Sequence, residues 1–147
     1  MGNIAATRRQ AQTIAAAVNG VNRAILGSEH QDPSSEFLAD LLGSPVVIIA
    51  PAHYTGIETT LQAGQAVKSF EFDVHLLFAY AAHNDFDNTA IEDLYELLTR
   101  AFWTPGNWTG ASVSACIDVS PFAFSAELKA SPIVSKWTAT LRFKGAV

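Results

Sequence analysis

Two segments of the chain alternate apolar and polar side chains at every second position. Between residues 70 and 80, one face carries Phe70, Phe72, Val74, Leu76, Phe78 and Tyr80, and the other carries Glu71, Asp73, His75, Leu77 and Ala79. In the last segment, one face carries Ile133, Ser135, Trp137, Ala139, Leu141 and Phe143, and the other carries Val134, Lys136, Thr138, Thr140, Arg142 and Lys144. A period of two predicts two strands, each with one face on a core and a well-specified register.

Apolar residues at helical spacing predict two helices. The first spans residues 7–26, with Gly27 as its stop signal and Gly20 in its interior. Its apolar stripe consists of Ile14, Val18, Val21 and Ile25. The second spans residues 89–102, and Thr89 and Glu92 have the spacing of a capping box at its start. Its apolar stripe consists of Ile91, Leu94, Tyr95, Leu98 and Phe102.

Shorter patterns fill the remaining positions. The β-branched run at 46–50 predicts a buried strand, and residues 112–120 predict another strand with Val113, Ala115, Ile117 and Val119 on one face. Residues 51–68 form a long excursion between two strands, which can be a hairpin arm with a short strand at 57–61. Residues 36–42 suggest a short helical turn, and residues 122–132 suggest a turn region.

The order of these elements predicts an α+β fold. The simplest architecture is a single mixed or antiparallel β-sheet with two main helices packed on one face and an extended hairpin arm. The length of 147 residues fits a single domain over residues 1–147, with no internal repeat or linker.

Composition narrows the classes of partner. Charged residues make up 16% of the chain, against the ~25% typical of globular domains, and the net charge is −5. Low charge suits either a large core or a surface covered by neighbouring subunits. No basic run extends beyond Arg8 and Arg9, so specific nucleic-acid binding is not expected. The best local cationic face is that of Lys136, Arg142 and Lys144, which can equally be a solvated strand face. No apolar run approaches the ~20 residues of a membrane span, so no membrane partner is expected.

Candidate chemistry is sparse. Glu71, Asp73 and His75 share one strand face and can form an acid/base group, or simply the solvent or interface side of a sheet. The segment 83–87 contains a histidine and two aspartates that can bind a hard cation, but these are also ordinary turn and helix-start residues. Phosphate-binding glycine motifs, nucleophile elbows and HExxH motifs are absent from the sequence. We therefore expect no catalytic residue, no metal and no cofactor.

Two further features concern packing or contacts. The single cysteine, Cys116, cannot form an intrachain disulfide and is interpreted as a small packing residue. Trp103 and Trp108 flank Pro105, and together they are either a binding hot spot or a cover for the end of the helix and the sheet.

The chain resembles the tail-terminator (tail-completion) proteins of long-tailed bacteriophages over most of its length. The resemblance is one of layout, in length and in the order of elements. It rests on the N-terminal helix, the strand at 46–50 with its long arm, the strand at 70–80, the helix at 91–102, the segment Ile117-Asp118-Val119-Ser120-Pro121 and the closing segment Ser131-Pro132-Ile133-Val134-Ser135-Lys136-Trp137.

The resemblance implies a non-enzymatic structural subunit of a virion, assembled in the host cytoplasm and located in the tail or neck. Such subunits form a hexameric ring that caps the tail tube and joins it to the head or neck. The implied partners are other copies of the chain, the tail tube protein and head–tail connector or neck proteins. DNA passes through such a ring, so Lys136, Arg142 and Lys144 would form a lumen or interface face.

Two alternatives stay open at this point. One is a head–tail connector or other neck protein, which is also structural but has a different partner. The other is a small enzyme or ligand-binding domain that uses Glu71, Asp73 and His75, and it predicts a deep pocket holding those side chains.

Overall fold

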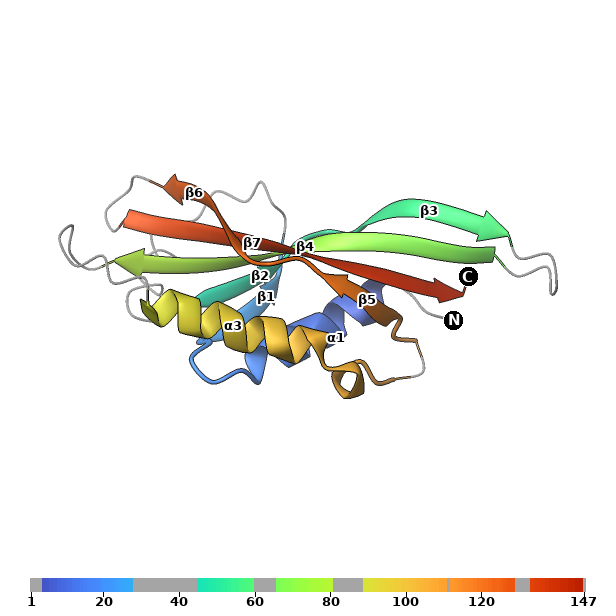
Figure 1. Cartoon of the computed structure of the whole chain (residues 1–147), viewed down its shortest axis with the longest axis horizontal. Coiled ribbons are helices and arrows are strands. Elements are labelled where there is room, and N and C mark those ends of the chain that lie inside the picture. The colour runs from blue at the N-terminus through green and yellow to red at the C-terminus, as the bar shows by residue number, and fades with distance from the viewer. Residues whose placement is uncertain are drawn as a thin grey trace.

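The computed structural model describes residues 4–27, 45–59, 66–80, 89–110, 112–128 and 133–146. Figure 1 shows the elements in chain order. They are α1 (Ile4–Ala16), β1 (Arg23–Leu26), β2 (Val46–Ile49), β3 (His53–Thr59), β4 (Ala66–Tyr80), α3 (Thr89–Trp103), the 3₁₀ turn η1 (Pro105–Asn107), β5 (Ala115–Val119), β6 (Ala123–Leu128) and β7 (Ile133–Ala146). Neither α1 nor α3 is long and apolar enough to cross a membrane.

Two long antiparallel strands, β4 and β7, form the centre of the sheet. They pair continuously from Val67↔Ala146 to Tyr80↔Ile133. On the side of β4 away from β7, β3 pairs with the first half of β4 and β2 pairs with the second half. The strand β1 pairs with the far side of β2 and forms an edge of the sheet. On the side of β7 away from β4, β6 pairs with the first half of β7 and β5 pairs with the second half. Because β1 and β2 are parallel and the other pairs are antiparallel, the fold is α+β with one mixed sheet, as predicted.

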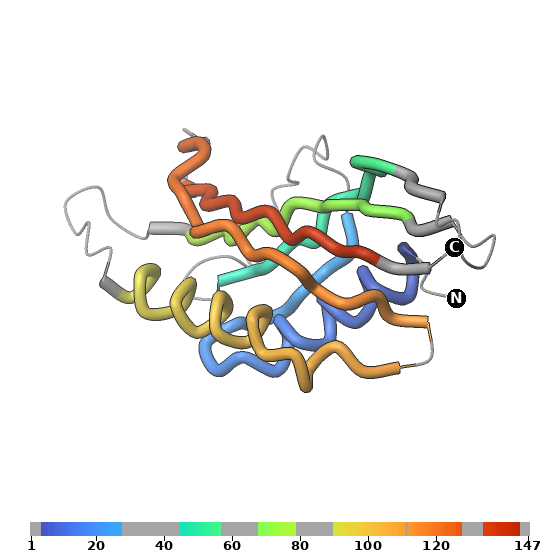
Figure 2. Tube along the Cα trace, turned by 45° about the vertical axis from the view of Figure 1, so that its right-hand side comes forward, coloured from blue at the N-terminus to red at the C-terminus, as the bar shows by residue number. Residues whose placement is uncertain are grey.

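Both helices cover one face of this sheet, which Figures 1 and 2 show from two directions. The apolar face of β4 meets that of β7 in the core, through the pairs Phe70↔Phe143, Phe72↔Leu141 and Val74↔Ala139. The helices contribute Ala11, Ile14, Ala15, Ile91, Leu94, Leu98 and Phe102 to the same core. At the positions whose side chains the structure describes, the predicted faces of both long strands and the predicted stripe of α3 are therefore confirmed.

The first predicted helix is wrong in its second half. The helix ends at Ala16, and residues 23–26 form β1 instead. Gly20 has a φ of 103°, a conformation that glycine adopts without strain and that turns the chain between α1 and β1. A Cβ at this position would also lie 3.3 Å from a methyl group of Leu94 in α3. The apolar spacing of 18, 21 and 25 thus belongs to a turn followed by a strand that pairs with β2.

Two predictions for the second half of the chain are also wrong. Residues 122–132 include a strand, β6, which pairs with β7 with an irregularity between Phe124 and Ala126. In β5, a register shift lies between Cys116 and Asp118. An extra residue changes which side chains face the core. Consequently Cys116 and Val119 pack on the core, whereas Ile117, placed on the apolar face by the sequence, is 51% exposed.

The arm is confirmed as a hairpin of β3 with the first half of β4, and the strand at 46–50 is confirmed as β2. Residues 57–59 of the predicted short strand at 57–61 are part of the longer β3, and residues 60–61 lie outside the described residues. The helical turn at 36–42, the cluster at 83–87 and the side chain of Thr89 lie outside the described residues and side chains.

Arg8 links the first helix to the sheet. Its Nε donates a hydrogen bond to the carbonyl of Ala50 at 2.9 Å, and its Nη2 donates to the carbonyl of Ile49 at 2.9 Å. We expect Arg8→Met to lower the free energy of unfolding by about 1–2 kcal/mol, because the partly buried carbonyl of Ala50 loses this charged donor. Ile49 keeps a hydrogen bond from the amide of Gly27. Urea unfolding measures the change, with the exposed Arg9→Met as the matched control. Equal effects at the two positions would contradict this role of Arg8.

Candidate functional site

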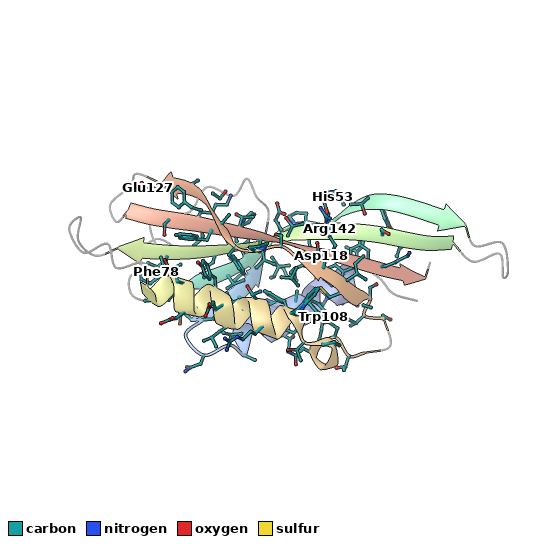
Figure 3. The ribbon with its side chains drawn as sticks, viewed as in Figure 1. His53, Phe78, Trp108, Asp118, Glu127 and Arg142 are labelled. Atoms are coloured by element: carbon teal, nitrogen blue, oxygen red, sulfur yellow. The ribbon has the colours of Figure 1, made fainter. Side chains whose placement is uncertain are left out.

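The face of the sheet opposite the helices carries a row of polar and charged side chains across four strands. His53 Nε2 of β3 lies 3.0 Å from Glu71 Oε1 of β4, and Arg142 Nε of β7 donates to Glu71 Oε2 at 3.1 Å. Arg142 Nη1 also lies 3.8 Å from Asp118 Oδ2 of β5. The labelled side chains His53, Arg142 and Asp118 gather in Figure 3. Glu71 is the least exposed member, so it anchors the row.

The next two residues on the same face of β4, Asp73 and His75, also contact β7. Thr140 Oγ1 donates to Asp73 Oδ1 at 2.8 Å, and the amide of Thr140 donates to Ser120 Oγ at 2.7 Å. His75 Nδ1 lies 2.8 Å from Thr138 Oγ1. His75 is buried, and this burial lowers its pKa from 6.5 to about 4. The nearby Lys136 lowers that pKa further, whereas Asp73 opposes the shift.

The three candidate acid/base residues therefore lie in line but do not converge. Glu71, Asp73 and His75 each bind a different residue of β7, namely Arg142, Thr140 and Thr138. Side chains two residues apart on one strand are separated by about 7 Å, so the pairing holds them in successive rows. Two open grooves in the described part of the chain are lined by other residues. This geometry serves a sheet surface better than acid/base catalysis.

The three cations of the predicted lumen face share the outer face of β7, but their environments differ. Arg142 is engaged by Glu71 and Asp118, so much of its charge is compensated within the chain. Lys144 is exposed, and Lys136 is half-buried. The contact of this face with DNA stays a prediction, and the free charge for it comes mainly from Lys144.

The two tryptophans at the end of α3 and just after it have different environments. Trp108 Nε1 donates to the carbonyl of Phe102 at 2.7 Å, and its ring lies 5.0 Å from that of Phe143. Trp108 thus covers the end of the helix and the core, whereas Trp103 is 56% exposed. Cys116 is partly buried, and burial raises the pKa of its thiol to about 11. A thiol with such a pKa is a poor nucleophile at neutral pH.

A patch of aromatic side chains lies between α3 and β6, and the sequence patterns did not predict it. We call Tyr95, Phe122, Phe124 and Trp137 the aromatic patch; adjacent ring centroids lie 5.6–6.0 Å apart. Phe124 is 54% exposed at its edge. Beside it lies an open groove of about 370 Å³, lined by Tyr95, Glu96, Thr99, Arg100, Val119, Pro121 and Phe122. Two of the four aromatic residues fall in the segment predicted as a turn, so no periodicity indicated their role.

Among the described residues, no three His, Cys, Asp or Glu side chains lie close enough together to hold a metal ion. The chain matches no protein-family model and no curated protein. Among solved structures, it is similar to a chain of the "Virion of native gene transfer agent (GTA) particle". The two chains are 12% identical, with a TM-score of 0.43, and the match covers 97% of this chain and 95% of that one.

Proposed function

We propose that the chain is a structural subunit of a bacteriophage-type virion and acts as a tail terminator. In this role, copies of the chain form a hexameric ring that caps the tail tube and joins it to the head or neck. The order of helices and strands supports the proposal through the family resemblance of the sequence. The protein is then located in the virion, after assembly in the host cytoplasm, and needs no cofactor.

The observation that carries the proposal is the placement of two different exposed surfaces on one elongated sheet. The hairpin of β3 and β4 projects past the helical layer at one end of the long axis, and β6 lies at the other end (Figure 1). A closed ring requires head-to-tail contacts, in which two different surfaces of each copy meet. A protomer with separate surfaces at its two ends meets this requirement.

The chemistry of the sheet face also favours a structural role. The carboxylates of Glu71 and Asp73 bind neighbouring strands instead of a shared pocket. Such cross-strand pairs stabilise the sheet and set its register. In the ring, the outer face of β7 with Lys136, Arg142 and Lys144 would face the lumen through which DNA passes, where Lys144 would supply nonspecific attraction to phosphates.

The proposal is tested by combining the purified chain with the tail tube protein of the same virus. We expect a particle with the mass of a closed ring in light scattering, and tubes capped at one end whose growth stops in electron micrographs. Tubes that grow without limit and carry no cap would contradict the terminator role. A head–tail connector would instead bind the neck or portal-side proteins and leave tube growth unchanged, so the same assay separates these two structural functions.

A further inference from the structure

The aromatic patch lies on the helix side of the sheet, at the end of the long axis that holds β6 and the first turns of α3 (Figures 1 and 2). Phe124 is 54% exposed, and its ring meets that of Trp137 edge to face, with centroids 5.6 Å apart. The ring of Trp137 meets that of Tyr95 of α3 at 5.8 Å, and Tyr95 also lines the open groove of about 370 Å³. The exposed ring of Phe124 is therefore continuous with a groove large enough for a partner side chain.

Three exposed carboxylates surround the patch, those of Glu92, Glu96 and Glu127. Glu127, which is labelled in Figure 3, shares the face of Phe124, because their partners on β7 are two residues apart. Glu96 lines the groove, and Glu92 lies one turn before it on the same side of α3. In the part of the chain that the structure describes, none of the three forms an ion pair.

The charge around the patch is negative. Arg100 also lines the groove, so three carboxylates and one guanidinium leave a net charge of −2. Lys136 does not offset this charge on the same surface, because it points to the other face of the sheet from its neighbours Ser135 and Trp137. A negative potential attracts cations and repels phosphate groups. The occupant of the patch is therefore a cation and not a nucleic acid or an anionic lipid surface.

An arginine side chain matches both features of this surface. Its planar guanidinium packs on the face of an exposed aromatic ring such as that of Phe124, because the negative face of the ring attracts the cation. Its N–H groups donate at the same time to carboxylates such as those of Glu96 and Glu127. A lysine ammonium is attracted by the same carboxylates, but it does not stack on a ring in this way. The patch therefore fits an arginine better than a lysine.

We propose that the aromatic patch and its groove bind an arginine-bearing segment of another virion protein. The inference rests on the proposed function, which supplies the class of partner and the orientation of the subunit. In the proposed ring, the opposite face of the sheet, with Arg142 and Lys144, lines the lumen. The patch then lies away from the lumen, where a tail tube or neck protein can reach it.

The experiment titrates the chain, at low salt in a calorimeter, with a capped peptide that carries arginines separated by glycines. A lysine peptide of the same design should bind roughly threefold more weakly, because it lacks the stacking contact. Phe124→Ala and Glu127→Gln should each raise the dissociation constant of the arginine peptide roughly threefold or more. The matched control is Asp93→Asn, which removes the same charge from an exposed position that faces away from Tyr95 and should bind like the wild type. Circular dichroism verifies that each variant is folded.

Several outcomes would overturn the proposal. Equal losses of affinity in Asp93→Asn and Glu127→Gln would show attraction to net charge alone, and the absence of saturable binding would remove the site; neither result affects the capping of tubes. Light scattering of the same variants tests a second copy as the occupant: if Phe124→Ala breaks up the assembly of the wild type, the patch belongs to the ring contact and not to another protein. If the peptide binds as expected but the chain does not cap tubes, the site stands and its assignment to a virion partner is overturned.

Discussion

Replacing Phe143 by alanine is expected to lower the free energy of unfolding by about 3–5 kcal/mol, the largest effect of any single substitution considered. Phe143 is fully buried at the centre of the core. Its ring stacks on those of Phe70 and Phe72, with centroids 5.2 and 4.9 Å away, and meets Trp108 edge to face at 5.0 Å. Alanine would leave a cavity among three aromatic side chains, two from β4 and one that follows η1, and they cannot all move into it.

Chemical unfolding monitored by circular dichroism measures this loss, at a concentration where the chain is monomeric. Phe124→Ala is the matched control, because it removes the same side chain from a position that is 54% exposed. We expect it to cost less than about 1 kcal/mol, since its ring is largely exposed and packs at its edge against Trp137. Comparable losses for the two variants would show that the stacked aromatic core does not determine stability.

The parts of the fold that could be predicted are those set by local periodicity. Phe70 and Phe143 belong to strands whose alternation continues for more than ten residues, so the buried face is unambiguous. The stripe of α3 is equally regular, from Ile91 to Phe102. Such long patterns fix the type of element and the buried face without knowledge of the partner.

The errors lie where a distant partner decides the structure. Val21 and Ile25 are spaced like a helical stripe, but pairing of β1 with β2 and the positive φ of Gly20 make the segment a turn and a strand. The strand β6 is short and irregular, and it exists because the long edge of β7 accepts it. In β5, one extra residue reverses the exposure of Ile117, which no alternation rule foresees.

The candidate surfaces were also predictable only where local periodicity determines them. The sequence placed Glu71, Asp73 and His75 on one face and Arg142 on the outer face of β7. The register between β4 and β7, which places Glu71 opposite Arg142 and His75 opposite Thr138, could not be predicted from these patterns. The aromatic patch could not be predicted, because it joins α3, β6 and β7 and the segment of Phe122 and Phe124 has no periodicity. Contacts between elements, and the surfaces that depend on them, require the three-dimensional structure.

Acidification is expected to destabilise the fold through His75. Its pKa is about 4 in the folded chain and 6.5 in the unfolded chain. Between these values the unfolded state binds a proton that the folded state does not, so stability decreases as the pH falls from 6.5 to 4. Below pH 4 both states are protonated, and this contribution no longer changes. The difference between these two pKa values corresponds to a loss of roughly 3 kcal/mol, which is nearly complete at pH 4.

His75→Asn isolates this contribution, because asparagine can keep a hydrogen bond to Thr138 Oγ1 but does not titrate in this range. Urea unfolding at a series of pH values from 7 to 4 should give a steeper decrease for the wild type than for the variant. The two curves should converge as the pH falls, since the penalty of protonating a buried imidazole beside Lys136 exists only in the wild type. All other residues are identical in the two proteins, so the difference between the curves reports on position 75. Parallel curves would mean that His75 can be protonated in the folded state without penalty, and the buried, neutral histidine would have to be abandoned as a determinant of the acid stability of this sheet.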